Sequence, residues 1–117
     1  WQDAENGYVK YSEQAGDEIM FTFEGTGASI EGWWVKNGGK ADVYVDGVFK
    51  RTIDCFYYYA KQEHRNINIF HILNLEEGKH TINIVVKGEK REESEGCAIG
   101  VRGAVVYKNG TKSYDAI

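Results

Sequence analysis

The sequence has no proline, only two cysteines among its 117 residues, and no apolar run approaching the ~20 residues needed to cross a bilayer. No membrane-spanning helix is therefore predicted. Without proline, the edges of any sheet must be protected by charge, glycine and bulges. Cys55 and Cys97 lack CxxC spacing and a histidine at metal-ligand spacing, which argues against zinc and thioredoxin-like chemistry. Each lies in a strand-like run and is interpreted as a small apolar filler, not as half of a required disulfide.

Positive charge is also scarce. Fourteen Lys and Arg residues against eighteen Asp and Glu residues give a formal net charge of -4, and the basic residues are dispersed along the chain. Such a surface repels a phosphate backbone, so nucleic acid is not predicted as a partner.

Motifs for catalysis are missing as well. The chain has no HExxH, GxSxG or P-loop, no GxGxxG that opens a helix, and its three histidines are scattered. Catalytic residues and a cofactor are therefore not predicted. The paired acidic residues Glu76-Glu77 and Glu92-Glu93 lie in predicted turns without DxDxDG-type spacing, so no metal site is predicted, with a structural calcium ion as the less favoured alternative.

What the sequence does contain is a composition of 42% hydrophobic and 27% charged residues, typical of one globular domain. Residues 1–117 are predicted to form a single module. The chain begins at Trp1 with no signal-peptide pattern, and we interpret it as a piece excised from a larger multidomain protein.

Strand periodicity dominates the pattern. EIMFTFE, from Glu18, alternates Ile19, Phe21 and Phe23 with polar or exposed positions, as a strand with one buried face requires. ADVYVDGVFKRTID, from Ala41, predicts a hairpin in which Asp46-Gly47 supplies the positive φ angles of a tight turn.

Further strand-like runs follow, namely NINIFHIL from Asn66, HTINIVVKG from His80 and CAIGVRGAVVY from Cys97. Gly100 and Gly103 within the last run indicate a bulge or a close backbone approach. About seven or eight strands without a sustained helical period favour an all-β fold, an antiparallel β-sandwich in preference to a barrel.

Aromatic residues are abundant, at 14% of the chain, and two groups exceed what one core face can absorb: Trp33-Trp34 and Tyr57-Tyr58-Tyr59. If Ala28 and Ile30 face inward, alternation directs Trp34 inward and Trp33 outward. Trp33 is therefore predicted to be exposed and Trp34 to be packed.

Exposed rings suit sugars, whose C–H faces pack on aromatic rings while their hydroxyls form directional hydrogen bonds. The predicted carbohydrate-binding residues are Trp33, Trp34, Tyr57, Tyr58, His64 and Arg65, with His64 and Arg65 assigned to the sugar hydroxyls. The alternative is that these rings only cap the ends of the sandwich.

Three segments together resemble a known family: FTFEGTGASIEG, GGKADVYVDGVFKRTID and LEEGKHTINIVVKGEK. They resemble the galactose-binding-like, jelly-roll modules attached to secreted bacterial glycoside hydrolases and SGNH/GDSL esterases, over roughly residues 8 to 107. The chain departs from this pattern at Gly103, where relatives often have an acidic residue, and at Trp33-Trp34, which replaces a glycine/proline-rich loop.

The resemblance implies a jelly-roll, galactose-binding-domain-like sandwich that is not an enzyme. It also implies an extracellular or cell-envelope location in a bacterium, and a covalently linked catalytic domain. We therefore expect an accessory carbohydrate-binding module. The alternative is a structural or protein-interaction domain that packs against a catalytic hydrolase.

Overall fold

The computed structural model describes residues 1–57, 64–108 and 111–117. Ten strands and one 3-10 turn are present in these ranges. In chain order they are β1 (Gln2–Ala4), η1 (Glu5–Gly7), β2 (Val9–Ser12), β3 (Glu18–Gly25), β4 (Gly27–Trp34), β5 (Lys40–Val45), β6 (Val48–Asp54), β7 (His64–Ile72), β8 (Gly78–Val86), β9 (Ile99–Lys108) and β10 (Thr111–Ala116). No helix in these ranges is long and apolar enough to cross a membrane.

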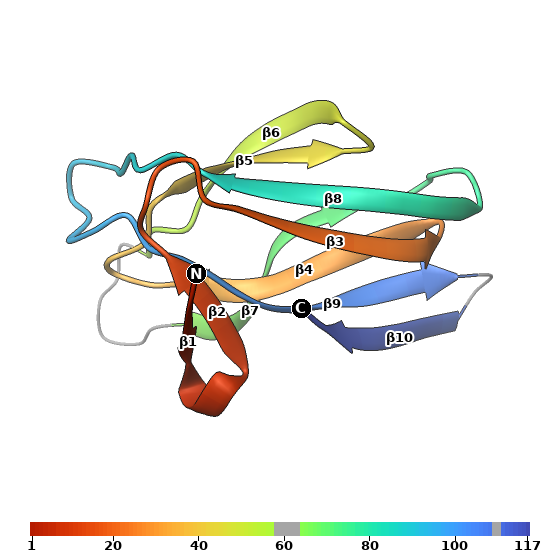
Figure 1. The fold of residues 1–117 in the computed structure, drawn as a ribbon, viewed down its shortest axis with the longest axis horizontal. Coiled ribbons are helices and arrows are strands. Elements are labelled where there is room, and N and C mark those ends of the chain that lie inside the picture. The colour runs from red at the N-terminus through yellow and green to blue at the C-terminus, as the bar shows by residue number, and fades with distance from the viewer. Residues whose placement is uncertain (58–63, 109–110) are drawn as a thin grey trace.

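The strands form two antiparallel sheets stacked face to face. One sheet has the order β1-β2-β9-β4-β7, with β10 also paired to β9, and the other has the order β3-β8-β5-β6. Figure 1 shows the two layers, with β3, β8, β5 and β6 above and the longer sheet below. This arrangement confirms the predicted antiparallel β-sandwich, and it adds the N-terminal pair β1 and β2 to the strands expected from the sequence.

The main core lies between the sheets and follows the predicted alternation. Phe23, Val43 and Val45 are buried, as their periodicity requires. The other large contributors are Ile30, Ile53, Phe70, Ile82, Ile84, Ile99 and Val101. The predicted hairpin turn is also confirmed, because Asp46 and Gly47 have φ angles of 51° and 79°.

Both cysteines are free thiols, so the fold has no disulfide between Cys55 and Cys97. Burial raises the pKa of the Cys55 thiol to about 12. The thiol is therefore uncharged at neutral pH and acts as the apolar filler that the sequence predicts.

The two ends of the sandwich differ in their connections. Tight turns join β3 to β4 and β5 to β6 at one end, on the right in Figure 1, where the β7–β8 connection also passes from one sheet to the other. The β4–β5 connection and the long β8–β9 loop lie at the other end. Trp33 and Trp34 lie at this loop-bearing end, where β4 ends.

Candidate functional site

Trp33 and Trp34 end strand β4 and point to opposite faces of the larger sheet. Trp34 lines a hollow together with Cys55, which belongs to the main core between the sheets. Trp33 instead packs in a separate small cluster with Val9 and Val35. The predicted alternation of the two side chains is therefore correct.

The predicted exposure of Trp33 is wrong, because its side chain is only 6% exposed. Its indole Nε1 donates a hydrogen bond of 2.7 Å to the Glu5 carboxylate, and its ring is stacked on Tyr11 with centroids 5.3 Å apart. The Arg65 guanidinium lies 4.7 Å from the ring centroid. A Cβ at Gly100 would lie 2.3 Å from the indole, so the ring rests directly on the β9 backbone.

The physical reason for this error is that the outer face of the sheet is covered at this point. Strand β2 pairs with β9 and brings Tyr11 opposite Gly100, while η1 supplies Glu5. The Trp33 side chain points away from the main core, but the N-terminal segment covers it there, so it does not reach solvent. A sugar-stacking platform built on Trp33 is excluded, and Arg65 belongs with Trp33 on this covered face.

Trp34, Tyr57 and His64 form an aromatic cluster on the other face of the sheet. The Trp34 ring meets Tyr57 edge to face at 4.6 Å and is stacked on His64 at 5.6 Å. The ring centroids of Tyr57 and His64 are 4.8 Å apart. Three of the six predicted binding residues are thus brought together, whereas Tyr58 lies outside the described residues.

A hollow of about 210 Å³ opens beside this cluster, and we call it the first hollow. It lies between the edge strand β7 and the end of β6. Its described lining residues are Trp34, Asp54, Cys55, Ile67, Asn68 and Ile69. The lining of the first hollow therefore combines an aromatic residue, two aliphatic residues, a thiol and two polar residues.

Asp54 supplies the only carboxylate among the described lining residues. Its Oδ1 accepts a hydrogen bond of 3.1 Å from the backbone N–H of Phe56, and its Oδ2 accepts one of 3.1 Å from Arg91 Nε. A carboxylate has about four acceptor sites, so these two bonds orient the group and leave capacity for a ligand hydroxyl.

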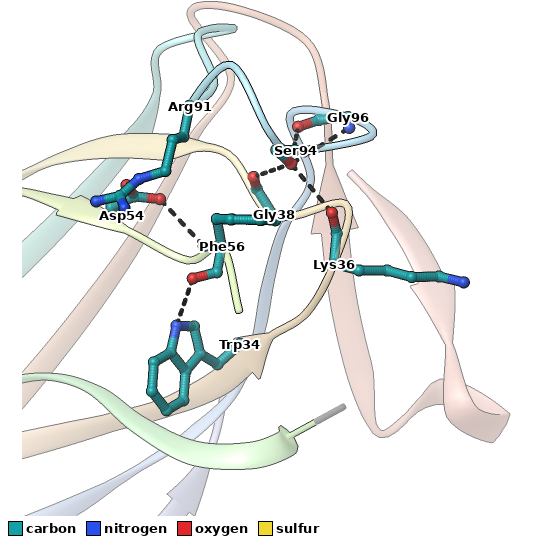
Figure 2. Close-up of polar contacts among 8 residues, drawn as sticks. All are labelled: Trp34, Lys36, Gly38, Asp54, Phe56, Arg91, Ser94 and Gly96. Atoms are coloured by element: carbon teal, nitrogen blue, oxygen red, sulfur yellow. Dashed lines mark hydrogen bonds and ion pairs between the residues drawn. The ribbon is translucent and has the colours of Figure 1, made fainter. Parts of the chain in front are cut away.

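The wall of the first hollow is fixed by further polar contacts, which Figure 2 shows. Trp34 Nε1 donates a hydrogen bond of 2.7 Å to the Phe56 carbonyl. The buried Ser94 hydroxyl lies 2.7 Å from the Gly38 carbonyl, joining the β8–β9 loop to the β4–β5 loop. The same β8–β9 loop carries Arg91, so one connection holds both the loop backbone and the Asp54 carboxylate.

The sequence did not predict five of the residues that line the first hollow, namely Asp54, Cys55, Ile67, Asn68 and Ile69. The sequence marks Asp54 as the end of a hairpin strand, and this position could have drawn attention to it. The β7 residues could not be recognised, because a bulge changes their alternation: Ile30 pairs with Phe70 and Glu31 pairs with Asn68.

Metal ligation has no candidate in the described part of the chain, where no three His, Cys, Asp or Glu side chains are grouped closely enough to hold an ion.

Comparison with known proteins identifies partial relatives. No family model matches the chain. The A type blood N-acetyl-alpha-D-galactosamine deacetylase of Flavonifractor plautii is 37% identical over 79 residues, which are 68% of this chain and 10% of that protein. The A type blood alpha-D-galactosamine galactosaminidase of the same organism is 30% identical over 92 residues, 74% of this chain and 8% of that protein. The chain thus spans about a tenth of the length of these relatives.

Among solved structures, a family 35 carbohydrate binding module from an environmental isolate has a similar fold. The TM-score is 0.55 at 18% identity, over 90% of this chain and 74% of that chain. At this identity the likeness establishes the fold alone. The fold is an antiparallel β-sandwich of the jelly-roll type, as the sequence resemblance implied.

Proposed function

We propose that this chain is a non-catalytic carbohydrate-binding module that accompanies a glycan-active enzyme. The observation that carries this proposal is the first hollow beside the aromatic cluster. Its volume of about 210 Å³ lies below the range of roughly 300 Å³ or more that is typical of drug-sized ligands, and it suits a single sugar ring.

The lining chemistry supports a sugar as the ligand. The Trp34 ring offers an apolar surface for the C–H face of a pyranose. The Asp54 carboxylate and the Asn68 amide supply acceptors and donors for hydroxyl groups at its rim. Although Arg91 offsets its charge, the Asp54 carboxylate offers only acceptors toward a ligand, so a sugar that donates hydroxyl or amine hydrogens is favoured over a uronic acid at this position.

Two further observations support a non-catalytic role. The matched segment is about a tenth of two relatives whose names state different activities, a deacetylase and a galactosaminidase. The described lining of the first hollow contains one carboxylate, whereas glycoside hydrolysis generally needs a pair.

The relatives' names also support a linked catalytic domain that acts on glycans. With it we propose an extracellular or cell-envelope location in a bacterium. A shallow single-ring contact gives weak binding, with a Kd of about 10 µM to 1 mM, or about 4 to 7 kcal/mol. Attachment to an enzyme compensates by raising the effective concentration of the module near the glycan.

The test is a glycan array with the purified chain, followed by titration calorimetry of the sugars that bind. We expect binding to neutral or amine-bearing glycans, and its loss in Trp34→Ala. Phe49→Ala is the matched control, because Phe49 is an exposed aromatic residue on β6 of the other sheet. Binding that survives Trp34→Ala, or no binding to any glycan, contradicts the proposal.

A second candidate function is a protein-interaction domain that packs against a catalytic hydrolase. It is favoured by exposed apolar side chains on β6, where Val48 and Phe49 are 57% and 51% exposed. The register places Phe49 opposite Tyr44. This alternative predicts no glycan binding and self-association that Phe49→Ser abolishes, measured by light scattering.

A further inference from the structure

A second hollow lies on the outer face of the larger sheet and has a volume of about 550 Å³. It lies against β4, β7 and β9 and the segments next to them, and its lining includes Thr26, Ser29, Asn68, His71, Leu73 and Tyr107. Ser29 pairs with His71 in the β4–β7 ladder, while its neighbours Ala28 and Ile30 belong to the main core. Ser29 and His71 therefore face away from the core.

Several polar residues line the second hollow, and their hydrogen bonds centre on Tyr107. The Tyr107 hydroxyl lies 3.2 Å from Ser29 Oγ, and the Tyr107 carbonyl accepts a hydrogen bond of 3.4 Å from Thr26 Oγ1. His71 is exposed at the rim. The described lining contains hydroxyl, imidazole and amide groups and no carboxylate, so it offers directional hydrogen bonds without a charge of fixed sign.

Asn68 lines both hollows. The bulge in β7 leaves Ile69 without a partner in the β4 ladder, so that Asn68 pairs with Glu31. Because β7 is the edge strand of its sheet, no further strand separates the hollows there. One strand is about 5 Å wide, a width comparable with one sugar ring.

We infer that the two hollows are consecutive subsites of one carbohydrate-binding site, which crosses the edge strand at Asn68. The first hollow takes the terminal ring of a glycan, and the second takes the sugar linked to it. The ligand is therefore the end of an oligosaccharide of at least two residues, and a free monosaccharide fills only part of the site. This inference rests on the proposed function.

The two subsites contact a glycan through different interactions, so each has a separate role. Trp34 provides ring stacking in the first hollow, whereas Ser29, Tyr107 and His71 provide hydrogen bonds in the second. Affinity for the terminal ring should depend on the first hollow alone. The additional affinity for a longer glycan, and the choice of its linkage, should depend on the second.

The experiment compares two ligands by titration calorimetry. One is the oligosaccharide that binds most strongly in the glycan array, and the other is the methyl glycoside of its terminal residue. We expect the oligosaccharide to bind at least about tenfold more tightly than the methyl glycoside. In His71→Ala and Ser29→Ala, oligosaccharide affinity should fall toward the methyl glycoside value, while methyl glycoside affinity stays within about twofold of wild type.

Asn68→Ala should weaken oligosaccharide binding. Its matched control is Asn83→Ala, which deletes an amide side chain from β8 of the smaller sheet. Thermal melts confirm that each variant is folded, and His71→Ala is the mildest change because its side chain is exposed. Equal affinity for both ligands, or oligosaccharide binding that is unchanged in His71→Ala and Ser29→Ala, overturns the inference and leaves the proposed function standing. Failure of the wild type to bind any glycan overturns both.

Discussion

Trp33 and Trp34 are adjacent in the sequence, yet the structure gives them opposite roles. Trp33 is buried on the outer face of the larger sheet, where Glu5, Tyr11 and Arg65 enclose it. Trp34 lies on the inner face, beside the first hollow. The residue that alternation directs outward is therefore the structural one, and the residue directed inward is available to a ligand.

Strand alternation determines the face of the sheet on which a side chain lies, but it does not determine the solvent exposure of that side chain. The outer face is covered where the β1–β2 segment crosses it, and the inner face is partly open where β6 and β7 end the two sheets. Exposure depends on what else in the fold lies over each face, which is a tertiary property.

The largest expected effect is on stability. Trp33→Ala should lower the free energy of unfolding by about 3 to 5 kcal/mol, because it removes a buried indole and the hydrogen bond that the indole donates to Glu5 Oε2. Urea unfolding followed by circular dichroism measures the change. Trp33→Phe, which keeps most of the apolar volume, should lose less. A loss under about 1 kcal/mol in Trp33→Ala would show that the indole is not enclosed as described.

Gly100→Ala should destabilise the chain by about 1 to 3 kcal/mol, because the added Cβ would lie 2.3 Å from the Trp33 ring. A double-mutant cycle sharpens the test. In the Trp33→Ala background the same substitution should cost much less, since the indole that clashes is gone. Equal costs in both backgrounds would mean that Gly100 is required for a reason other than the stacked ring.

Trp34→Ala should show the reverse pattern. Its cost in stability should be less than half that of Trp33→Ala, because the side chain is only partly buried. Its cost in glycan affinity should be at least about tenfold, or about 1.4 kcal/mol. Paired urea and calorimetric titrations on the two variants measure both quantities. If both variants lose stability and binding in parallel, the two faces are not functionally distinct.

Much of the fold was predictable, because it follows local periodicity. The alternation of Phe23, Val43 and Val45 and the Asp46-Gly47 turn depend on neighbouring residues, and all are confirmed. Gly100 was correctly predicted at a close backbone approach. The candidate site was only partly predictable. Trp34, Tyr57 and His64 are together as expected, although alternation gave no information on the cover over Trp33.

The remaining site residues depend on relations that one strand's pattern does not contain. Asp54 and Asn68 meet at the first hollow because the edge strands of two different sheets approach each other. The β7 bulge also changes which side chains face the core. His71 shares its parity with Ile67 and Ile69 in the sequence, but it is exposed on the outer face.

The smallest expected effect concerns the end of the sandwich that carries the tight turns, and it serves as a control for both tryptophans. His80 Nδ1 lies 2.6 Å from Asp46, and its Nε2 lies 2.6 Å from the Glu76 carbonyl. A carbonyl only accepts, so Nε2 carries a hydrogen. The hydrogen bond to Glu76 and then the one to Asp46 raise the pKa of His80. The hydrogen bonds from His80 and from the Thr81 N–H lower the pKa of Asp46.

Because the folded state raises the pKa of His80, its stabilising contribution is complete below the unfolded pKa of about 6.5 and is lost as pH rises through the folded value. The folded state lowers the pKa of Asp46, so the stabilising contribution of Asp46 is present above its ordinary pKa and is lost as pH falls through the lowered pKa. Since Asp46 is 45% exposed, solvent screening limits the pair to under about 1 kcal/mol. The stability advantage of wild type over His80→Gln should therefore be larger near about pH 5.5 than near about pH 8.5, measured by thermal melts. Binding of the methyl glycoside, which the first hollow alone takes, should be the same in His80→Gln and wild type at both pH values, and a difference would mean that the two ends of the sandwich are coupled.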